Sequence, residues 1–218
     1  MSASTFRPPR QARSAATLDR IVQAAEELLA ERGFDQATVD DIVARAGSSK
    51  GSFYSRFVDK EALLAYLGGE CMARAKATWA EQFDPERVAS APLAEVIDEF
   101  VGRMLDEYRE SAPVLRALIL EARLHPGNEF ERMTDDLDAH VRNTLAALLA
   151  ARAARGQIGH ADPAQAARVG MLLMDASIRE AVIFATDRDR PLTVPAAELR
   201  RELTRAFLGY LRSVDPPA

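Results

Sequence analysis

The chain has 218 residues, of which 48% are hydrophobic, 28% charged and 6% aromatic, with a formal net charge of -5. This length is enough to bury a substantial core, as one large domain or a small domain joined to a larger one. The one cysteine, Cys71, excludes an intramolecular disulfide framework and a multi-cysteine zinc site. No apolar run approaches the ~20 residues of a membrane span, and no apolar stretch follows the first arginines, so we expect a cytoplasmic protein without a membrane role.

Charge is distributed unevenly along the chain. Residues 1–60 carry nine Lys and Arg and eight Asp and Glu, whereas residues 61–218 carry nineteen and twenty-five. Arg7, Arg10 and Arg13 precede the first acidic residue. A basic site on an acidic body is typical of local contact with a polyanion, but chance placement of a few charges explains the same pattern.

The first 33 residues divide into an arm and a helix. Residues 1–16 lack apolar periodicity and are predicted to form a disordered basic arm. From Leu18 to Leu29 the apolar residues recur at helical spacing. Gly33 then provides a C-terminal stop, so the first helix is expected to end there.

Two short helices follow, joined by a tight turn. Thr38 and Asp41 form a capping signature at the start of one helix, which Gly47 ends. Ser49 is placed to cap the next helix, which is expected to run as far as Phe57. Two short helices joined by a glycine-containing turn make a helix-turn-helix unit, and we assign residues 17–60 to this domain.

The remainder of the chain is expected to be helical with short breaks. Prolines and glycines divide it, and Asp162-Pro163 is a cap followed by a first-turn proline. No segment has a convincing strand pattern, so the fold class is all-α with about nine helices. Residues 61–214 form the larger C-terminal domain, with expected helices at about 60–83, 92–108, 113–125, 129–155, 163–189 and 195–213.

One stretch carries a resemblance to a known family. The run TVDDIVARAGSSKGSFYSRFVDK, from Thr38 to Lys60, resembles the DNA-binding domain of the tetracycline-repressor (TetR) family of bacterial regulators. The preceding IVQAAEELLAERGFDQAT is similar to the first helix of that family. The match extends over about residues 17–64. Ser48 departs from it, since a branched aliphatic residue is usual there, which loosens one core contact at the turn.

The short third helix has the residue types that a reading helix needs. Its N-terminal residues can reach base edges in a major groove, and small side chains let the backbone approach the duplex. The resemblance implies base contacts by Lys50, Gly51, Ser52, Tyr54 and Arg56, phosphate contacts by Thr38, Tyr54 and Lys60, and a DNA face completed by Ser49 and Ser55. The alternatives to DNA contact are that Tyr54 is simply an aromatic residue on the surface and that Arg56 is simply a solvated charge.

The larger domain is implied to hold an effector pocket and a dimer interface. The resemblance implies pairing through the last two long helices, where Ala166, Ala167, Gly170 and Ala176 permit close packing. The alternative is that these helices only cover the core of their own protomer. Methionines and aromatics at helical spacing are usually core residues, so the pocket list is an expectation only. Its members are Met104, Tyr108, Leu120, Arg123, Met133, Leu137, His140, Met171, Met174, Asp175 and Phe184.

Two adjacent glycines interrupt the fourth helix. Gly68 and Gly69 each cost about 1 kcal/mol relative to alanine in a helix interior. One hypothesis is a bend that lets an effector move the DNA-binding domain. The alternative is that a neighbouring helix packs closely against the glycines.

These expectations describe a dimeric, ligand-responsive regulator that binds a palindromic DNA operator, and we expect a repressor that a small molecule releases. An activator or dual regulator of the same fold is the alternative. A helical enzyme or an adaptor protein belongs to other classes, but the sequence has no nucleophile–base pair and no phosphate loop of recognised form. We expect no cofactor, no metal and no catalytic residue.

Overall fold

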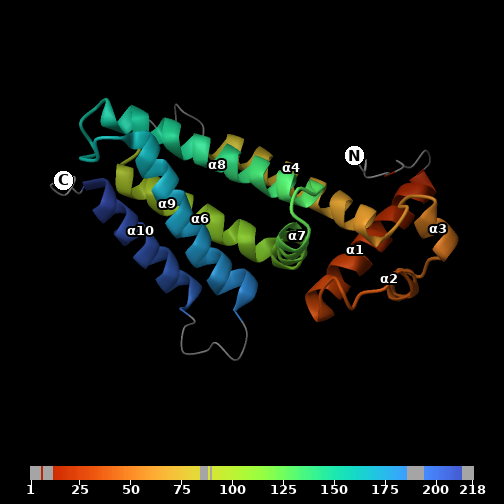
Figure 1. Ribbon diagram of the computed structural model, residues 1–218. Coiled ribbons are helices and arrows are strands. Elements are labelled where there is room, and N and C mark those ends of the chain that lie inside the picture. The colour runs from red at the N-terminus through yellow and green to blue at the C-terminus, as the bar shows by residue number, and fades with distance from the viewer. Residues whose placement is uncertain (1–5, 7–11, 84–87, 89, 186–193, 213–218) are drawn as a thin grey trace. The chain divides into compact units, whose positions relative to one another are not determined.

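The computed structural model describes residues 6, 12–83, 88, 90–185 and 194–212. Within these residues it has nine α-helices, one π-helix and no strand (Figure 1), which confirms the predicted all-α class. The chain forms two compact units. The first combines Met1–Arg74 with Ser111–Asp135, and the second combines Ala75–Glu110 with Asp136–Ala218. This division differs from the predicted boundary after Lys60, because the start of the fourth helix and a later helix belong with the N-terminal helices.

The first unit contains the expected three N-terminal helices. Its turns depend on glycines in the left-handed region, with φ of +80° at Gly33 and +55° at Gly47, conformations that side chains disfavour. Each of these helices buries apolar side chains, among them Ile21, Ile42 and Phe53. The helices of the first unit are α1 (Ala12–Arg32), α2 (Val39–Arg45), α3 (Lys50–Tyr54), the start of α4 (Lys60–Gln82) and α7 (Ala112–Leu124).

The N-terminal arm is shorter than expected. Helix α1 begins at Ala12, so the prediction of a disordered arm is wrong for residues 12–16. Alanines in this stretch favour helix through propensity alone, a signal that apolar periodicity does not detect. Phe6 is also described, with its ring centroid 4.4 Å from that of Tyr66 and 5.6 Å from that of Phe57. The other residues of the arm lie outside the described part of the chain.

The second unit is built around a core of apolar side chains. Trp79, Ile97, Phe100, Leu145 and Leu149 are almost fully buried within it. Besides the end of α4, its elements are α6 (Leu93–Glu110), the part of α8 (Glu129–Ala153) after Asp135, α9 (Pro163–Ile178), the π-helix η1 (Arg179–Phe184) and α10 (Ala196–Arg212). As predicted, Asp162 caps α9 by accepting from the backbone N–H groups of Ala164 and Gln165.

Three of the four small residues of α9 pack inside one protomer. Ala166 and Ala167 are fully buried, and a Cβ at Gly170 would lie 2.2 Å from Cε2 of Phe207 on α10. These residues therefore let α10 approach α9 within one protomer. For these three residues the packing is that of the alternative, in which α9 covers the core of its own protomer, whereas Ala176 is exposed.

A second close approach joins α6 to α10. The Arg200 guanidinium donates to both carboxylate oxygens of Asp98, at 3.1 and 2.7 Å. Gly102 lies one helical turn from Asp98, and a Cβ there would be 2.6 Å from Cζ of Arg200. The glycine thus leaves the space that the arginine side chain occupies.

The expected long helix from 163 to 189 changes its hydrogen-bonding pattern part-way. It is α-helical to Ile178 and continues as the π-helix η1 from Arg179 to Phe184. Residues 186–193 lie outside the described residues. Single-turn π segments inside helices are frequent at functional sites, and η1 begins with Arg179, the polar residue described below.

Candidate functional site

Helix α2 begins with a complete capping box. The Asp41 N–H donates to Thr38 Oγ1 at 3.2 Å, and the Thr38 N–H donates to Asp41 Oδ2 at 3.1 Å. Arg32 of α1 forms an ion pair with the same carboxylate at 3.0 Å. Bonds from the Thr38 hydroxyl and N–H hold the pKa of Asp41 below its ordinary value. The predicted cap is confirmed, and Thr38 remains exposed at the start of α2.

Helix α3 is fixed by one cap and two buried rings. The Ser52 N–H donates to Ser49 Oγ at 3.1 Å, which satisfies one of the free donors at the helix start. Phe53, together with Phe57 just beyond the helix, is completely buried. Because these rings face inward, the residues between and before them are turned away from the core.

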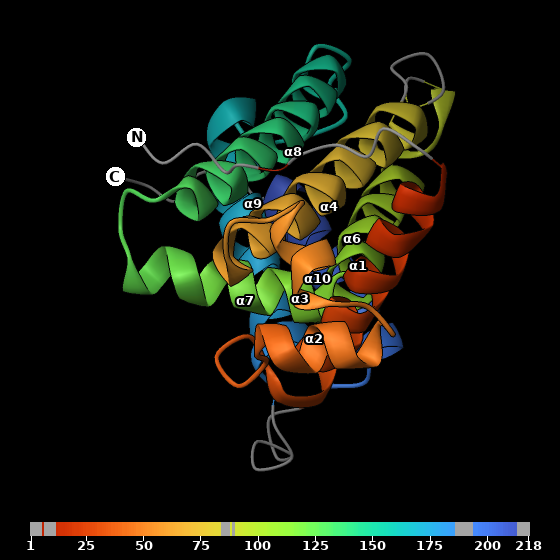
Figure 2. The ribbon, with the colours of Figure 1, turned by 90° about the vertical axis from the view of Figure 1, so that its right-hand side faces the viewer.

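Most of the predicted DNA-contact residues lie on α3 or next to it, and Figure 2 shows where this short helix runs in the first unit. Lys50, Gly51 and Ser55 are exposed and Tyr54 is 51% exposed, whereas Ser52 and Arg56 are half-buried. A Cβ at Gly51 would meet only Ser49 Oγ, at 3.8 Å, so no side chain projects from the helix surface at this position. The face is therefore small, polar and open to solvent.

Two lysines of this region have partners. Lys50 Nζ lies 2.7 Å from Asp40 Oδ1, and this hydrogen bond raises the pKa of the ammonium. Lys60 Nζ donates to the Phe34 carbonyl at 2.8 Å and lies 4.1 Å from the centre of the Phe34 ring. The first ammonium stands on the exposed face, and the second ties the start of α4 to the loop after α1.

Comparison with known families assigns both parts of the chain. A model described as "Bacterial regulatory proteins, tetR family" matches residues 21–67. A second, described as "Tetracyclin repressor-like, C-terminal domain", matches residues 92–211, which is more than half of the chain. The chain belongs to the TetR family. Its first unit accordingly contains the helix-turn-helix of this family of bacterial regulators.

Individual relatives agree with this assignment. YerO, an HTH-type transcriptional regulator of Bacillus subtilis, is 30% identical over 136 residues, which are 58% of this chain and 45% of YerO. The chain spans less than half the length of the curated relatives it matches. The fatty acid degradation regulator FadR from Bacillus halodurans has a TM-score of 0.68 at 21% identity, with 94% of this chain and 99% of that chain covered. FadR from Bacillus subtilis, solved in complex with stearoyl-CoA, has a TM-score of 0.62 at 21% identity and coverage of 91% and 100%.

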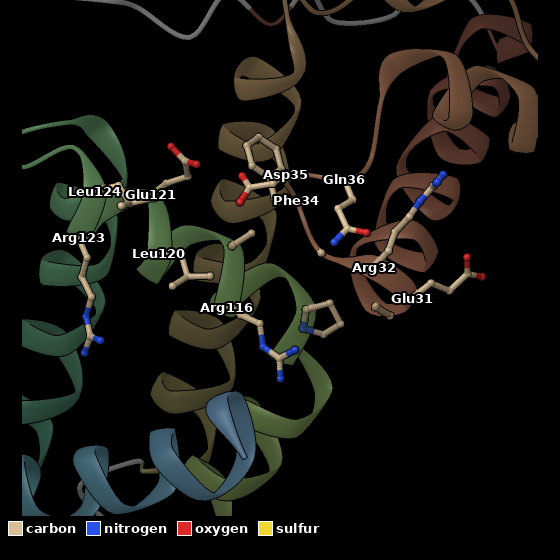
Figure 3. Close-up of a pocket in the computed structure, with 14 residues that line it drawn as sticks. Glu31, Arg32, Phe34, Asp35, Gln36, Arg116, Leu120, Glu121, Arg123 and Leu124 are labelled. Carbon is tan, nitrogen blue, oxygen red and sulfur yellow. The ribbon is translucent and has the colours of Figure 1, made fainter. Parts of the chain in front are cut away.

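The predicted effector residues do not form a single group. Leu120, Arg123 and Met133 belong to the first unit, and the first two line a cavity of about 570 Å³ there. Figure 3 shows that this cavity lies between α7 and the end of α1 with its following loop. The other eight belong to the second unit, where Met104, Met171 and Met174 are core residues. Core burial of these three methionines is what their helical spacing alone predicts.

A polar group in the second unit includes two predicted pocket residues. The Tyr108 hydroxyl donates to Asp175, and Arg179 of η1 pairs with the other oxygen of the same carboxylate. Burial, and then the Asp175 charge, raise the pKa of Tyr108 well above its ordinary value. Within this group, Nε of Arg179 is buried without a hydrogen-bond partner among the described residues, and the same holds for Nε2 of His140 on α8. Leu137 and Phe184 are half-buried.

The sequence did not point to a second cavity, of about 270 Å³, in the second unit. Its described lining is mostly apolar and comes from the end of α4, the segment before α6 and the last turns of α8: Phe83, Val88, Thr144, Ala147, Leu148, Ala151, Arg152 and Arg155. Arg152 is only 3% exposed. An arginine in an alanine-rich helix gives no local sign of burial, because its partners are far away in the sequence.

The two glycines of α4 differ in their surroundings. A Cβ at Gly68 would lie 2.8 Å from Cε of Met133 and 3.1 Å from Leu118, whereas a Cβ at Gly69 would meet nothing within 4 Å. Close packing therefore accounts for Gly68. It does not account for Gly69, and α4 is continuous through both residues.

Among the described residues, no group of three or more His, Cys, Asp or Glu side chains is arranged to hold a metal ion. No helix in the described part of the chain has the length and apolar character needed to cross a bilayer.

Proposed function

We propose that the protein is a ligand-responsive transcriptional regulator that binds DNA as a homodimer and represses until a small molecule releases it. The outward side of α3 carries this proposal. This capped helix of five residues buries the Phe53 ring in the core. It exposes Lys50, Gly51 and Tyr54 to solvent. Such a helix fits the major groove at its N-terminal end.

The contacts that we propose follow from this placement. Lys50, Gly51, Ser52, Tyr54 and Arg56 contact base edges, since they lie on or next to α3. Thr38, Tyr54 and Lys60 contact phosphates, with Ser49 and Ser55 beside them. Lys60 Nζ has further donors after its bond to Phe34, because an ammonium carries three N–H groups.

The proposed dimer interface involves α9 and α10. Leu172 and Leu173 of α9 are 67% and 55% exposed, and adjacent exposed leucines are typical of a surface that another chain covers. Two reading helices about 34 Å apart are needed for a two-fold operator. A substitution of Leu172 and Leu173 by Glu should give monomers in analytical ultracentrifugation and abolish operator binding. Leu124→Glu on α7, also at an exposed leucine (65%), is the control and should stay dimeric; dimers in both variants would refute this interface.

DNA binding is tested with fragments recovered from the genome by pull-down with the purified protein. Fluorescence anisotropy should give specific binding in excess competitor DNA, with an affinity that falls as salt rises with a slope of several phosphates. Binding that competitor abolishes completely would contradict the proposal.

The division of roles among the basic residues has its own test. Lys60→Ala should weaken binding to all sequences alike, whereas Lys50→Ala and Arg56→Ala should change the preferred sequence, at about 1–3 kcal/mol per lost base contact. Arg142→Ala, at an exposed position on α8, is the control. Identical effects of all three substitutions would show that the roles are wrongly divided.

Release by an effector requires different affinities for two dimer geometries, with a typical coupling of about 1–3 kcal/mol. The bend hypothesis for α4 now rests on Gly69 alone. Gly69→Ala should keep operator affinity and reduce the effector-induced loss of it. An unchanged response would remove Gly69 from the mechanism.

A further inference from the structure

The 270 Å³ cavity of the second unit contains a buried positive charge. Arg152, 3% exposed, lines it together with Arg155. The described partners of the Arg152 guanidinium are the backbone carbonyls of Val88 and Ala91, the latter at 2.6 Å, and the side-chain oxygen of Gln157 at 2.8 Å. All three are neutral oxygens. Burial, and then the charge of Arg155, lower the pKa of Arg152.

A buried cation is stabilised most by an anion. The described partners of the Arg152 guanidinium include no carboxylate, so they leave its charge uncompensated. Apart from Thr144 and the two arginines, the described lining is apolar, and Phe83, Val88 and Leu148 are its buried apolar members. Ligand sites combine such apolar walls with a few polar groups that fix orientation.

We propose that this cavity binds a small carboxylate with an apolar body, whose carboxylate lies against Arg152 and Arg155 and whose body contacts Phe83, Val88 and Leu148. The volume is slightly below the roughly 300 Å³ at which sites for drug-sized ligands begin, so a short chain is expected. A role for this ligand as the effector rests on the proposed function. Its binding in the cavity does not depend on that function.

The chain provides an optical reporter beside the cavity. Trp79 is the only tryptophan, and its ring centroid is 4.9 Å from that of Phe83, in a stacked arrangement. Because Phe83 lines the cavity, occupancy should change the emission of Trp79. Binding is therefore measured on the full chain without a label and without DNA.

The probes are octanoate, 1-octanol and octylamine, which share a chain and differ in charge. Octanoate should change Trp79 emission saturably, 1-octanol should bind about tenfold more weakly, and octylamine should bind more weakly still. A tenfold loss is the size expected for one charge-assisted hydrogen bond. Equal affinities for the three probes would show that binding depends on the alkyl chain and not on the carboxylate, which would overturn the proposal.

Variants locate the binding. Arg152→Gln should lower octanoate affinity about tenfold or more while leaving that for 1-octanol unchanged. Since this substitution also removes bonds to Val88 and Ala91, Arg155→Gln is a second variant, with Arg142→Gln as its matched control on α8. Ala151→Phe fills the cavity and should abolish octanoate binding, whereas Ala150→Phe, also exposed but not in the lining, should not. Octanoate binding that survives in Ala151→Phe places the ligand elsewhere and overturns the proposal.

A DNA experiment separates this inference from the proposed function. Octanoate that binds wild type but not Ala151→Phe establishes the site, even if the protein binds no operator. If operator binding is present, octanoate should lower it in wild type and leave it unchanged in Ala151→Phe. If the protein binds an operator but octanoate does not change Trp79 emission, the proposed regulatory function would stand and the proposed carboxylate site would be overturned.

Discussion

The two units of the molecule differ in where their polar groups lie. In the first unit, the capping oxygens of Thr38 and Ser49 accept from N–H groups three residues further along the chain. In the second unit, Tyr108 bonds to Asp175, 67 residues away, and Arg152 bonds to the carbonyls of Val88 and Ala91, more than 60 residues away. The proposed DNA face is thus specified mainly by local signals, whereas these internal polar contacts depend on packing between distant segments.

The largest expected effect concerns packing within the second unit. Gly170→Ala should lower the free energy of unfolding by about 1–3 kcal/mol, the usual cost of overpacking, because its Cβ would overlap the Phe207 ring. Gly209→Ala on α10, where nothing lies within 4 Å, is the matched control and should stabilise by about 0.5–1 kcal/mol. Urea unfolding measures both, and equal effects would show that α9 and α10 are not closely packed.

Substitution in the capping box of α2 tests how much a local signal contributes to the stability of the first unit. Thr38→Ala removes the hydroxyl that accepts from Asp41 and should cost about 1 kcal/mol. Thr38→Ser, which keeps the oxygen, should retain most of that stability. Chemical denaturation gives the difference; indistinguishable alanine and serine variants would mean that the cap contributes nothing.

Ser48 stands where a branched aliphatic residue is usual in the family. Its Oγ is buried without a hydrogen-bond partner among the described residues. Because an unsatisfied buried hydroxyl is unfavourable, Ser48→Val should raise the unfolding free energy by about 1 kcal/mol. Ser49→Val next to it removes the α3 cap and should act in the opposite direction. A destabilised Ser48→Val variant would show that the hydroxyl has a partner in solution.

The smallest effect is a pH dependence in the second unit. Hydrogen bonding to Arg200 is the main cause that holds the pKa of Asp98 below 3.8. A carboxyl with a lowered folded-state pKa stabilises fully above its unfolded value and loses this contribution as pH falls through the folded value. Asp98→Asn should therefore cost about 0.2–1 kcal/mol near pH 7, the range of partly exposed pairs.

The difference between wild type and Asp98→Asn should shrink below pH 4 in unfolding measured between pH 2 and 7. Glu95→Gln, exposed on the same helix, should follow wild type throughout. A gap that stays constant with pH would show that Asp98 acts through packing rather than charge.

Much of the fold was predictable, since prolines, glycines and capping residues mark helix ends locally. At the start of α4 the Asp59 carboxylate accepts from the Ala62 N–H at 2.7 Å, and Pro163 opens α9 as expected. Side-chain direction was less predictable in alanine-rich helices, where many faces look apolar. The sequence left open whether Gly170 packs between copies or within its own protomer, and the structure places it against Phe207.

The candidate site divides in the same way. The proposed DNA face follows from Ser49, Phe53 and Phe57, three residues within nine positions. Arg152 and Val88 are 64 residues apart, so no local pattern indicates their contact. The methionines of the expected pocket were chosen by type alone, and packing places three of the four, Met104, Met171 and Met174, in the core.

The contact between Lys60 and Phe34 has a mechanical consequence. It clamps the first turn of α4 to the loop that ends α1, while Arg32 and Asp41 join α1 to the start of α2. The end of α1 and the first turns of α2 and α4 are therefore joined at the loop after α1, although Lys60 and Phe34 are 26 residues apart in the chain. Loss of either contact is expected to loosen this loop first, because each one ties a helix end to it.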